Sequence, residues 1–241
     1  MVGGAQTTVD GSNGVIGAGV RPQGVPVREV VRRPSQGAGS AVPFESQPEE
    51  TDRMRVTVTP EQIKVAFEAV KDDPSFDESR GLWERGRPPV EMIQAMCLRP
   101  ELLRAFAGFG GCVYPGGMLE RRVKELVIIT ASTTNECQFC TNSHVDLVDI
   151  ADIVADPLLV IEQTGSLAPR ERLAIAYTRA AMADSNAIPE PLMRELHEQF
   201  SDPEYVELTF LIGFITMLNL FNNLLQVRYN GEYSVLKVPV D

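Results

Sequence analysis

The sequence has no apolar run long enough to cross a membrane. Its most apolar stretch, residues 208–218, is shorter than the ~20 residues that a spanning helix needs, and asparagines follow it directly. The pair Arg32 and Arg33 resembles the start of an export signal, but polar residues follow where such a signal needs an apolar run. We therefore expect no membrane span, no targeting peptide and a cytoplasmic protein.

Positive charge and cysteine are both scarce. The chain has 22 Lys and Arg against 33 Asp and Glu, a formal net charge of -11, and no basic stripe in its second half. This balance argues against a nucleic-acid partner, because phosphate binding needs clustered cations.

Only four cysteines occur. In a reducing compartment, a close cysteine pair indicates redox or metal chemistry rather than a structural disulfide.

Large apolar residues are scarce in residues 1–55, where glycine, proline and serine are abundant. Such a segment cannot bury enough surface to offset the conformational entropy that ordering would cost. We therefore predict a disordered Gly/Pro-rich arm over residues 1–55.

A helical extension is predicted next, over residues 56–88. Thr59 is a good helix cap, and Pro60 suits the first helical position. The end of this extension, residues 83–87, has two open interpretations: a lid over a site or an interface arm. The main domain is predicted to occupy residues 89–241.

Helix follows helix in this main domain, and no segment has the pattern of a sheet core. The fold class is therefore all-α. The predicted helices span residues 90–97, 101–108, 119–132, 136–150, 152–163, 169–183, 190–200 and 203–225. A small hairpin is predicted at 229–232, where Asn-Gly suits a tight turn.

The last predicted helix is apolar on nearly every side. A helix of this kind must be covered on most of its surface, which one small domain seldom achieves. We expect part of it, or of helix 119–132, to lie at a subunit interface.

Chemistry concentrates in a short segment that ends at His144. Asn135 is a good helix cap with Gln138 three residues later, which predicts a helix beginning at Asn135. Cys137, Cys140 and His144 then share one helix face. The helix dipole and free amides of the first turn lower the pKa of a thiol placed there, as expected for Cys137.

Glu125 lies in the preceding helix within an apolar run. A carboxylate there can orient and charge His144, which yields a base-activated thiol nucleophile. The Cys-x-x-Cys pair can close into a disulfide once one sulfur is oxidised. A structural zinc site is not favoured, because it needs a fourth ligand while Cys97 and Cys112 are isolated.

The arrangement of Glu125, eleven residues, Cys137-x-x-Cys140, three residues and His144 resembles the signature of the carboxymuconolactone decarboxylase superfamily, in its alkyl hydroperoxidase D (AhpD) branch. The resemblance covers about residues 90–225. Three flanking segments also resemble the family: 115–125, 167–173 and 219–222.

This resemblance implies an all-α bundle that assembles as trimers or hexamers. It implies that Cys140 is the thiolate that attacks a hydroperoxide, that Cys137 resolves the sulfenic acid, and that Glu125 and His144 relay protons. No cofactor beyond this dithiol is implied, and the reductant is a dihydrolipoyl or thioredoxin-like partner. The chain departs from the best-known AhpD at Phe139, which replaces a histidine and makes the mouth of the site more apolar, suited to a lipid-like hydroperoxide.

Two arguments disagree on the attacking sulfur. Helix position favours Cys137, whereas closeness to His144 favours Cys140, and we follow the second because proton removal needs a base within reach.

Three functions remain open. They are a thiol peroxidase or disulfide reductase, a carboxymuconolactone decarboxylase-like acid-base enzyme without a redox dithiol, and a non-enzymatic oligomeric interaction module whose arm recruits a partner.

Overall fold

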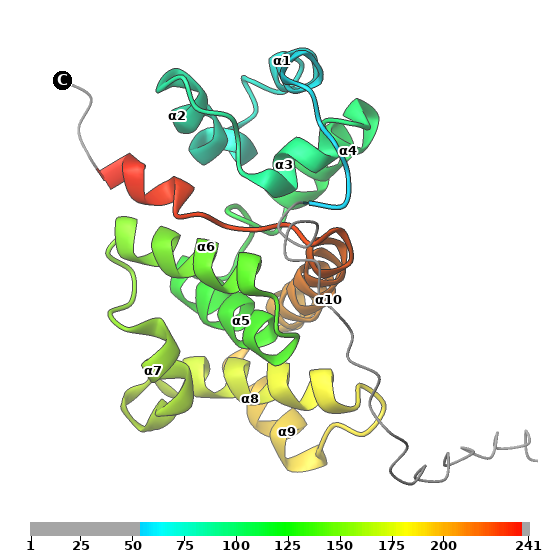
Figure 1. Cartoon of the computed structure of the whole chain (residues 1–241). Coiled ribbons are helices and arrows are strands. Elements are labelled where there is room, and N and C mark those ends of the chain that lie inside the picture. Colours follow the sequence, from blue (N-terminus) through cyan, green and yellow to red (C-terminus); the bar gives the residue numbers. More distant parts are fainter. Residues whose placement is uncertain (1–53, 238–241) are drawn as a thin grey trace, which may run out of the picture. The chain divides into compact units, whose positions relative to one another are not determined.

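The computed structural model describes residues 54–237, and every regular element within this range is a helix (Figure 1). The predicted all-α fold class is confirmed. All described residues belong to one compact unit. The predicted arm, residues 1–55, lies outside the described residues except for its last two positions.

Five helical elements form the N-terminal part of this unit. They are α1 (Pro60–Glu68), η1 (Pro74–Phe76), α2 (Asp77–Glu84), α3 (Glu91–Met96) and α4 (Pro100–Gly111). The predicted start of α1 is confirmed: Thr59 Oγ1 accepts from the amide of Gln62, and the Gln62 side chain accepts from the amide of Thr59. These reciprocal bonds satisfy amides that would otherwise lack partners at the helix end.

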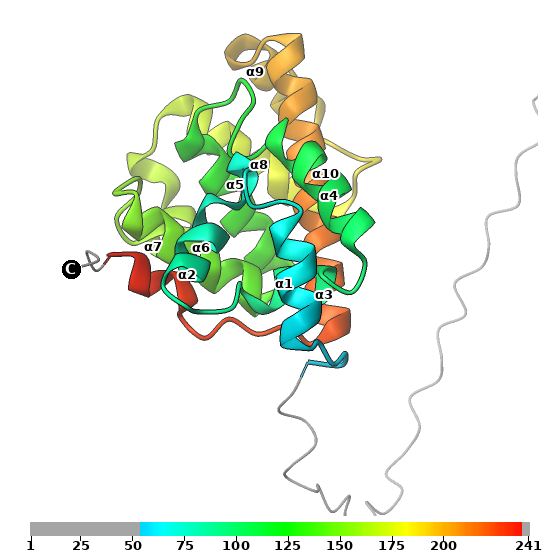
Figure 2. The same cartoon turned by 90° about the horizontal axis from the view of Figure 1, so that it is seen from above.

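The remaining elements build a bundle around α5. They are α5 (Arg121–Thr134), α6 (Gln138–Ile150), α7 (Pro157–Glu162), η2 (Thr164–Ser166), α8 (Pro169–Ala183), α9 (Glu190–Gln199), α10 (Asp202–Leu225) and η3 (Glu232–Lys237). Helix α5 contacts α6, α7, α8 and α10, and every residue from Val123 to Ser132 is buried. Helix α10 also packs on α4, where Phe106 stacks on Phe214 with ring centroids 5.8 Å apart (Figure 2).

The predicted helix start at Asn135 is wrong. Asn135 ends α5, and α6 begins at Gln138 with Cys137 as its N-cap. The backbone reverses at Glu136, whose φ of 53° lies in the left-handed region and interrupts both helices. Cys137 is therefore the residue before the helix, while Cys140 lies in its first turn.

Two further predictions are corrected. Residues 152–156 are not helical, because Asp152 and Asp156 have φ values of 50° and 46° and Pro157 then starts α7. The predicted hairpin at 229–232 is also wrong, since the C-terminal segment continues into the 3-10 helix η3. A lone hairpin has no sheet to pair with here, whereas η3 packs on α2 and α6.

Contrary to the expectation from residues 208–218, helix α10 is by length and composition long and apolar enough to cross a membrane, with a mean hydropathy of 1.7. In the structure it is a core helix, because Leu208, Leu211 and Ile215 are buried against the bundle. Its outer face keeps apolar side chains exposed: Val206, Phe210, Met217, Leu220 and Leu224. Two helices were predicted to form a subunit interface. Helix α5 is buried inside the subunit, whereas α10 presents this exposed apolar face. Assembly through α10 stays a prediction.

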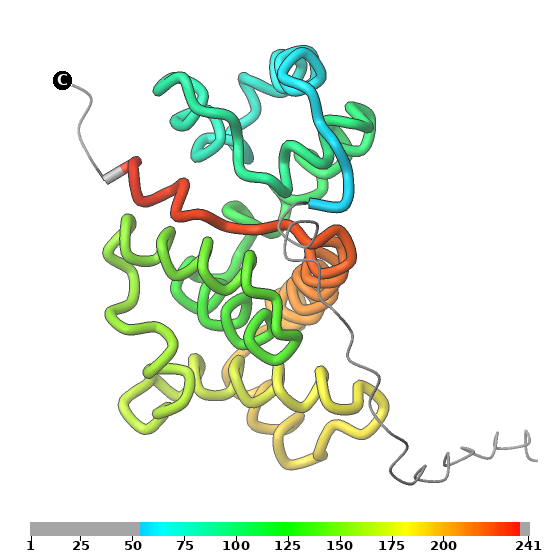
Figure 3. The backbone as a smooth tube through the Cα atoms, in the orientation of Figure 1, coloured from blue at the N-terminus to red at the C-terminus, as the bar shows by residue number. Residues whose placement is uncertain are grey.

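The C-terminal segment crosses between the α1–α4 group and α6 (Figure 3). The Tyr229 hydroxyl and the Ser234 hydroxyl both donate to the Asp146 carboxylate on α6, the latter at 2.8 Å. Residue Gly81 on α2 lies so close to η3 that an added Cβ would stand 3.0 Å from Leu236. The extension and the C-terminal segment therefore pack on each other and on α6.

The loop before α5 is held by a buried ion pair. Lys124 is fully buried, and its Nζ lies 2.7 Å from Oε1 of Glu207 on α10. The Glu207 carboxylate also accepts from the amides of Met118 and Leu119 at 2.5 and 3.2 Å. Gly117 has φ +100°, and an added Cβ would stand 2.2 Å from the Glu207 carboxylate, so this turn requires glycine.

Candidate active site

The two cysteines of the Cys-x-x-Cys motif lie in contact at the N-terminus of α6. Their Sγ atoms are 2.9 Å apart, and the side chains are 1% and 3% exposed for Cys137 and Cys140. At this separation the thiol of one cysteine donates a hydrogen bond to the sulfur of the other, so the two sulfurs share a proton. A disulfide between them requires little backbone movement.

The first proton leaves Cys137. The hydrogen bond from the Cys140 thiol lowers the pKa of Cys137 to about 7 against burial, with help from the Cys140 backbone amide. The same contact and burial raise the pKa of Cys140. The neighbouring thiol is thus the main cause of the lowered pKa, and the backbone amide at the N-terminus of α6 adds to it in the direction that helix position predicts for Cys137.

Asparagines of α10 complete the surroundings of the dithiol. Asn222 Nδ2 donates to Cys140 Sγ at 3.1 Å, and Asn219 Nδ2 donates to Ser132 Oγ at 3.0 Å. Both asparagines are fully buried, where an amide needs hydrogen-bond partners. Their place in the last helix matches the polar pair seen in the sequence.

Glu125 and His144 form the predicted pair. Glu125 Oε2 lies 2.8 Å from His144 Nδ1, and Glu125 is fully buried. Burial alone would raise the pKa of this carboxyl, but His144 and Arg121 outweigh it and hold the pKa below its usual value. The carboxylate is therefore ionised and accepts from Nδ1, which leaves Nε2 of His144 as the proton-exchanging nitrogen.

Two partners of Glu125 were missed from the sequence. The Tyr114 hydroxyl and Arg121 Nε both donate to Glu125 Oε1, at 2.8 and 2.5 Å. The Tyr114 ring stands edge-on to the His144 ring with centroids 5.2 Å apart. The sequence could have indicated Arg121, because it precedes Glu125 by four residues on one helix. It could not have indicated Tyr114, since this residue comes from the loop before α5.

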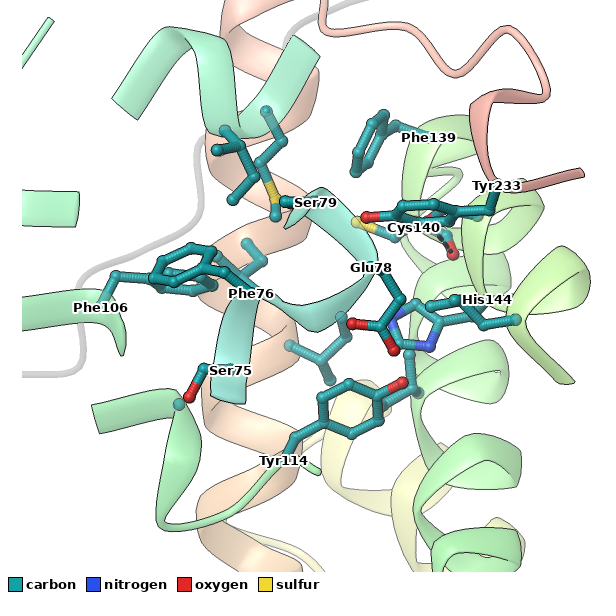
Figure 4. A pocket seen from close by; sticks show the side chains of 18 of the residues that line it. Ser75, Phe76, Glu78, Ser79, Phe106, Tyr114, Phe139, Cys140, His144 and Tyr233 are labelled. Atoms are coloured by element: carbon teal, nitrogen blue, oxygen red, sulfur yellow. Dashed lines mark hydrogen bonds between the residues drawn. The ribbon is translucent and has the colours of Figure 1, made fainter. Parts of the chain in front are cut away.

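A cavity of about 90 Å³ opens over the dithiol (Figure 4). Cys140 and His144 line it, and Cys137 is not among the lining residues. Phe139 also lines the cavity, with Phe76, Phe106, Phe214 and aliphatic side chains, so its walls are largely apolar. Of the two sulfurs, Cys140 is thus the one that a molecule in this cavity meets.

The cover of the cavity comes from the N-terminal extension and from η3. Ser75, Phe76, Glu78 and Ser79 line it from η1 and α2, and Tyr233 lines it from η3. No residue of 83–87 lines this cavity, so the choice between a lid and an interface arm for that segment stays open. Within residues 54–237, no group of three or more His, Cys, Asp and Glu side chains is arranged to hold a metal ion.

Comparison with known proteins gives a consistent picture. Residues 100–148 match the model of the carboxymuconolactone decarboxylase family. No match was found among curated proteins.

Solved structures share the fold. An uncharacterized peroxidase-related protein from Silicibacter sp. TM1040 is 19% identical, with a TM-score of 0.60 over 78% of this chain and 97% of that one. An AhpD-core, peroxidase-related protein from Ralstonia eutropha JMP134 is 21% identical, with a TM-score of 0.60 over 78% and 98%. The debrominase Bmp8 in complex with 2,3,4-tribromopyrrole is 19% identical, with a TM-score of 0.54 over 68% and 90%. The family match over residues 100–148 and this shared fold make the chain similar to carboxymuconolactone decarboxylase/AhpD-like proteins.

Proposed function

We propose that the chain is a thiol-dependent peroxidase that reduces hydroperoxides with its Cys137–Cys140 dithiol. The observation that carries this proposal is the contact of the two sulfurs at 2.9 Å, with Cys140 facing a cavity that His144 also lines. The solved structures with this fold include a peroxidase-related protein and a debrominase, which makes an enzymatic role consistent with the fold.

The proposed reaction begins at Cys140. Its thiolate attacks the terminal oxygen of the hydroperoxide, the O–O bond breaks, and Cys140 becomes a sulfenic acid. The alkoxide leaves as an alcohol with a proton from His144, whose imidazolium Glu125 stabilises at 2.8 Å.

The second step closes the disulfide. Cys137 attacks the Cys140 sulfur, and the sulfenic hydroxyl leaves as water after taking up a proton. The dithiol has then supplied the two electrons that reduced the O–O bond. A dihydrolipoyl or thioredoxin-like dithiol returns them by thiol-disulfide exchange, so no other cofactor is needed in this cycle.

The lowered pKa of Cys137 is compatible with attack by Cys140. The Cys137 thiolate lies 2.9 Å from the Cys140 sulfur and is the base nearest to its proton. Movement of that proton to Cys137 produces the Cys140 thiolate in the cavity, where the oxidant arrives. His144 then acts on the leaving group rather than as the first base.

A carboxymuconolactone decarboxylase-like acid-base function is the second candidate. The buried pair of Glu125 and His144, with Arg121 and Tyr114 on the same carboxylate, favours it because such a pair can move a proton without any thiol. The candidates separate on one point: an acid-base reaction keeps its rate when both cysteines are replaced.

We also propose a homo-oligomer that covers the apolar face of α10.

Peroxide should join Cys137 and Cys140 and leave the other cysteines reduced. Burial raises the pKa of Cys97 to about 11, and Cys112 lies at the end of α4, remote from a second thiol in the part of the chain described. Peptide mass spectrometry after stoichiometric hydroperoxide, followed by a dithiol reductant, measures this directly. A dominant bridge that contains Cys97 or Cys112 would remove the basis of the proposed cycle.

The proposed proton relay predicts that removing His144 slows disulfide formation more than changing Glu125 does, and that the two effects do not add. His144→Ala should slow disulfide formation by about a hundredfold or more, and Glu125→Gln by about tenfold, because the leaving alkoxide loses its positioned proton donor. The double variant should cost little more than His144→Ala, because the pair acts as one unit. Stopped-flow rates against pH measure these effects, with His197→Ala on the surface of α9 as the control. Unchanged rates and pH profiles in both single variants would mean that the dithiol works without a relay.

A further inference from the structure

Glu78 is the only carboxylate in the lining of the dithiol cavity as the structure describes it. It comes from α2, in the cover, and it forms no hydrogen bond or ion pair with any other residue of the described range. Figure 4 shows its carboxylate pointing into the same opening as the His144 imidazole and the Tyr114 hydroxyl. A partly buried charge without a protein partner is free to interact with whatever enters the cavity.

The field of Glu78 reaches the other polar groups around the opening. Burial is the main cause of the raised pKa values of Tyr114, beneath it, and of Tyr233 on η3, and the Glu78 charge adds to both; it also acts on the Arg121 guanidinium. The lining residues given by the structure include no lysine or arginine. The nearby cation, Arg121, is committed to Glu125 and Tyr114. Together with the thiolate of the cysteine pair, Glu78 gives the cavity a negative potential.

We propose that Glu78 makes this site selective for small neutral oxidants and excludes anionic ones. This inference rests on the proposed function and names its substrate class. A neutral hydroperoxide can donate its O–H to the Glu78 carboxylate, which places the terminal oxygen in the cavity that Cys140 lines. An anionic oxidant has no proton to donate and meets like charge in a site with little solvent.

The size of the cavity points to the same class. About 90 Å³ accommodates hydrogen peroxide or a short alkyl hydroperoxide. The apolar walls accept a short alkyl group, and the lining residues offer an anion no lysine or arginine to pair with.

The test compares two reagents of nearly equal size that differ in charge. Neutral iodoacetamide and anionic iodoacetate both alkylate thiolates, so their rate ratio at Cys140 reports charge selectivity without any peroxidase turnover. In the wild type we expect a ratio well above that for a free thiol. Glu78→Gln, which keeps the shape, should lower the ratio by about tenfold. Glu84→Gln removes the same charge from an exposed position of α2 and should leave it unchanged.

Peptide mass spectrometry locates the label, and tert-butyl hydroperoxide is tested in parallel. An unchanged ratio in Glu78→Gln would overturn the proposal, and so would failure of iodoacetamide to label Cys140 in the wild type. If the ratio falls as expected but the hydroperoxide does not oxidise the dithiol, anion exclusion stands and the peroxidase function fails. The two proposals therefore have separate outcomes.

Discussion

Replacing Cys140 with alanine should reduce hydroperoxide turnover at least about a thousandfold and raise the pKa of Cys137 from about 7 toward its ordinary value of 9.0. Cys140 has both effects because its sulfur faces the cavity and lies 2.9 Å from the Cys137 sulfur, where its thiol donates to Cys137 once Cys137 is a thiolate. The loss of that hydrogen bond removes the largest cause of the lowered pKa. Thiolate absorbance against pH measures the shift, and peroxide consumption measures the turnover.

The sign of the pH dependence follows from the same pair. In the wild type, the rate of disulfide formation should rise with pH through about 7, because only the Cys137 thiolate can take the Cys140 proton. Cys137→Ala should still consume one equivalent of peroxide slowly and stop at a Cys140 sulfenic acid, which dimedone traps. Cys112→Ser, at an exposed position, is the matched control. A Cys140→Ala protein in which Cys137 still titrates near 7 would contradict this account.

Replacing Lys124 with methionine should destabilise the fold by about 3–5 kcal/mol, since it leaves the Glu207 carboxylate buried without its cation. The ion pair is 2.7 Å long, with Lys124 fully buried and Glu207 10% exposed. For a domain of this size such a loss lowers the melting temperature by roughly 10 °C. Thermal unfolding followed by circular dichroism measures it.

A surface pair provides the control. Lys71 and Glu68 form an exposed ion pair on the N-terminal extension, so Lys71→Met should leave the melting temperature unchanged. Adding Glu207→Leu to Lys124→Met should recover part of the loss, because it removes the unpaired charge. Equal melting temperatures for wild type and Lys124→Met would show that the buried pair does not hold the loop before α5.

The local sequence determined the helices and the chemical identity of the site. Helical periodicity, proline at helix starts and the cap at Thr59 act over a few residues, and the structure has these helices within a few residues of the prediction. The spacing of Glu125, Cys137, Cys140 and His144 placed the same four side chains in one site. Glu125 could be associated with His144 because an acid within an apolar run needs a buried partner.

Tertiary structure decided what depends on contacts between distant segments. The reversal at Glu136 moved the start of α6, so that Cys137 caps the helix rather than lying within it. Tyr114 and Glu78 reach the dithiol only because the loop before α5 and the extension fold over α6. Which thiol has the lowered pKa and which the raised one likewise depends on the separation and burial of the two sulfurs. Such contacts join residues far apart in the chain, and no local pattern records them.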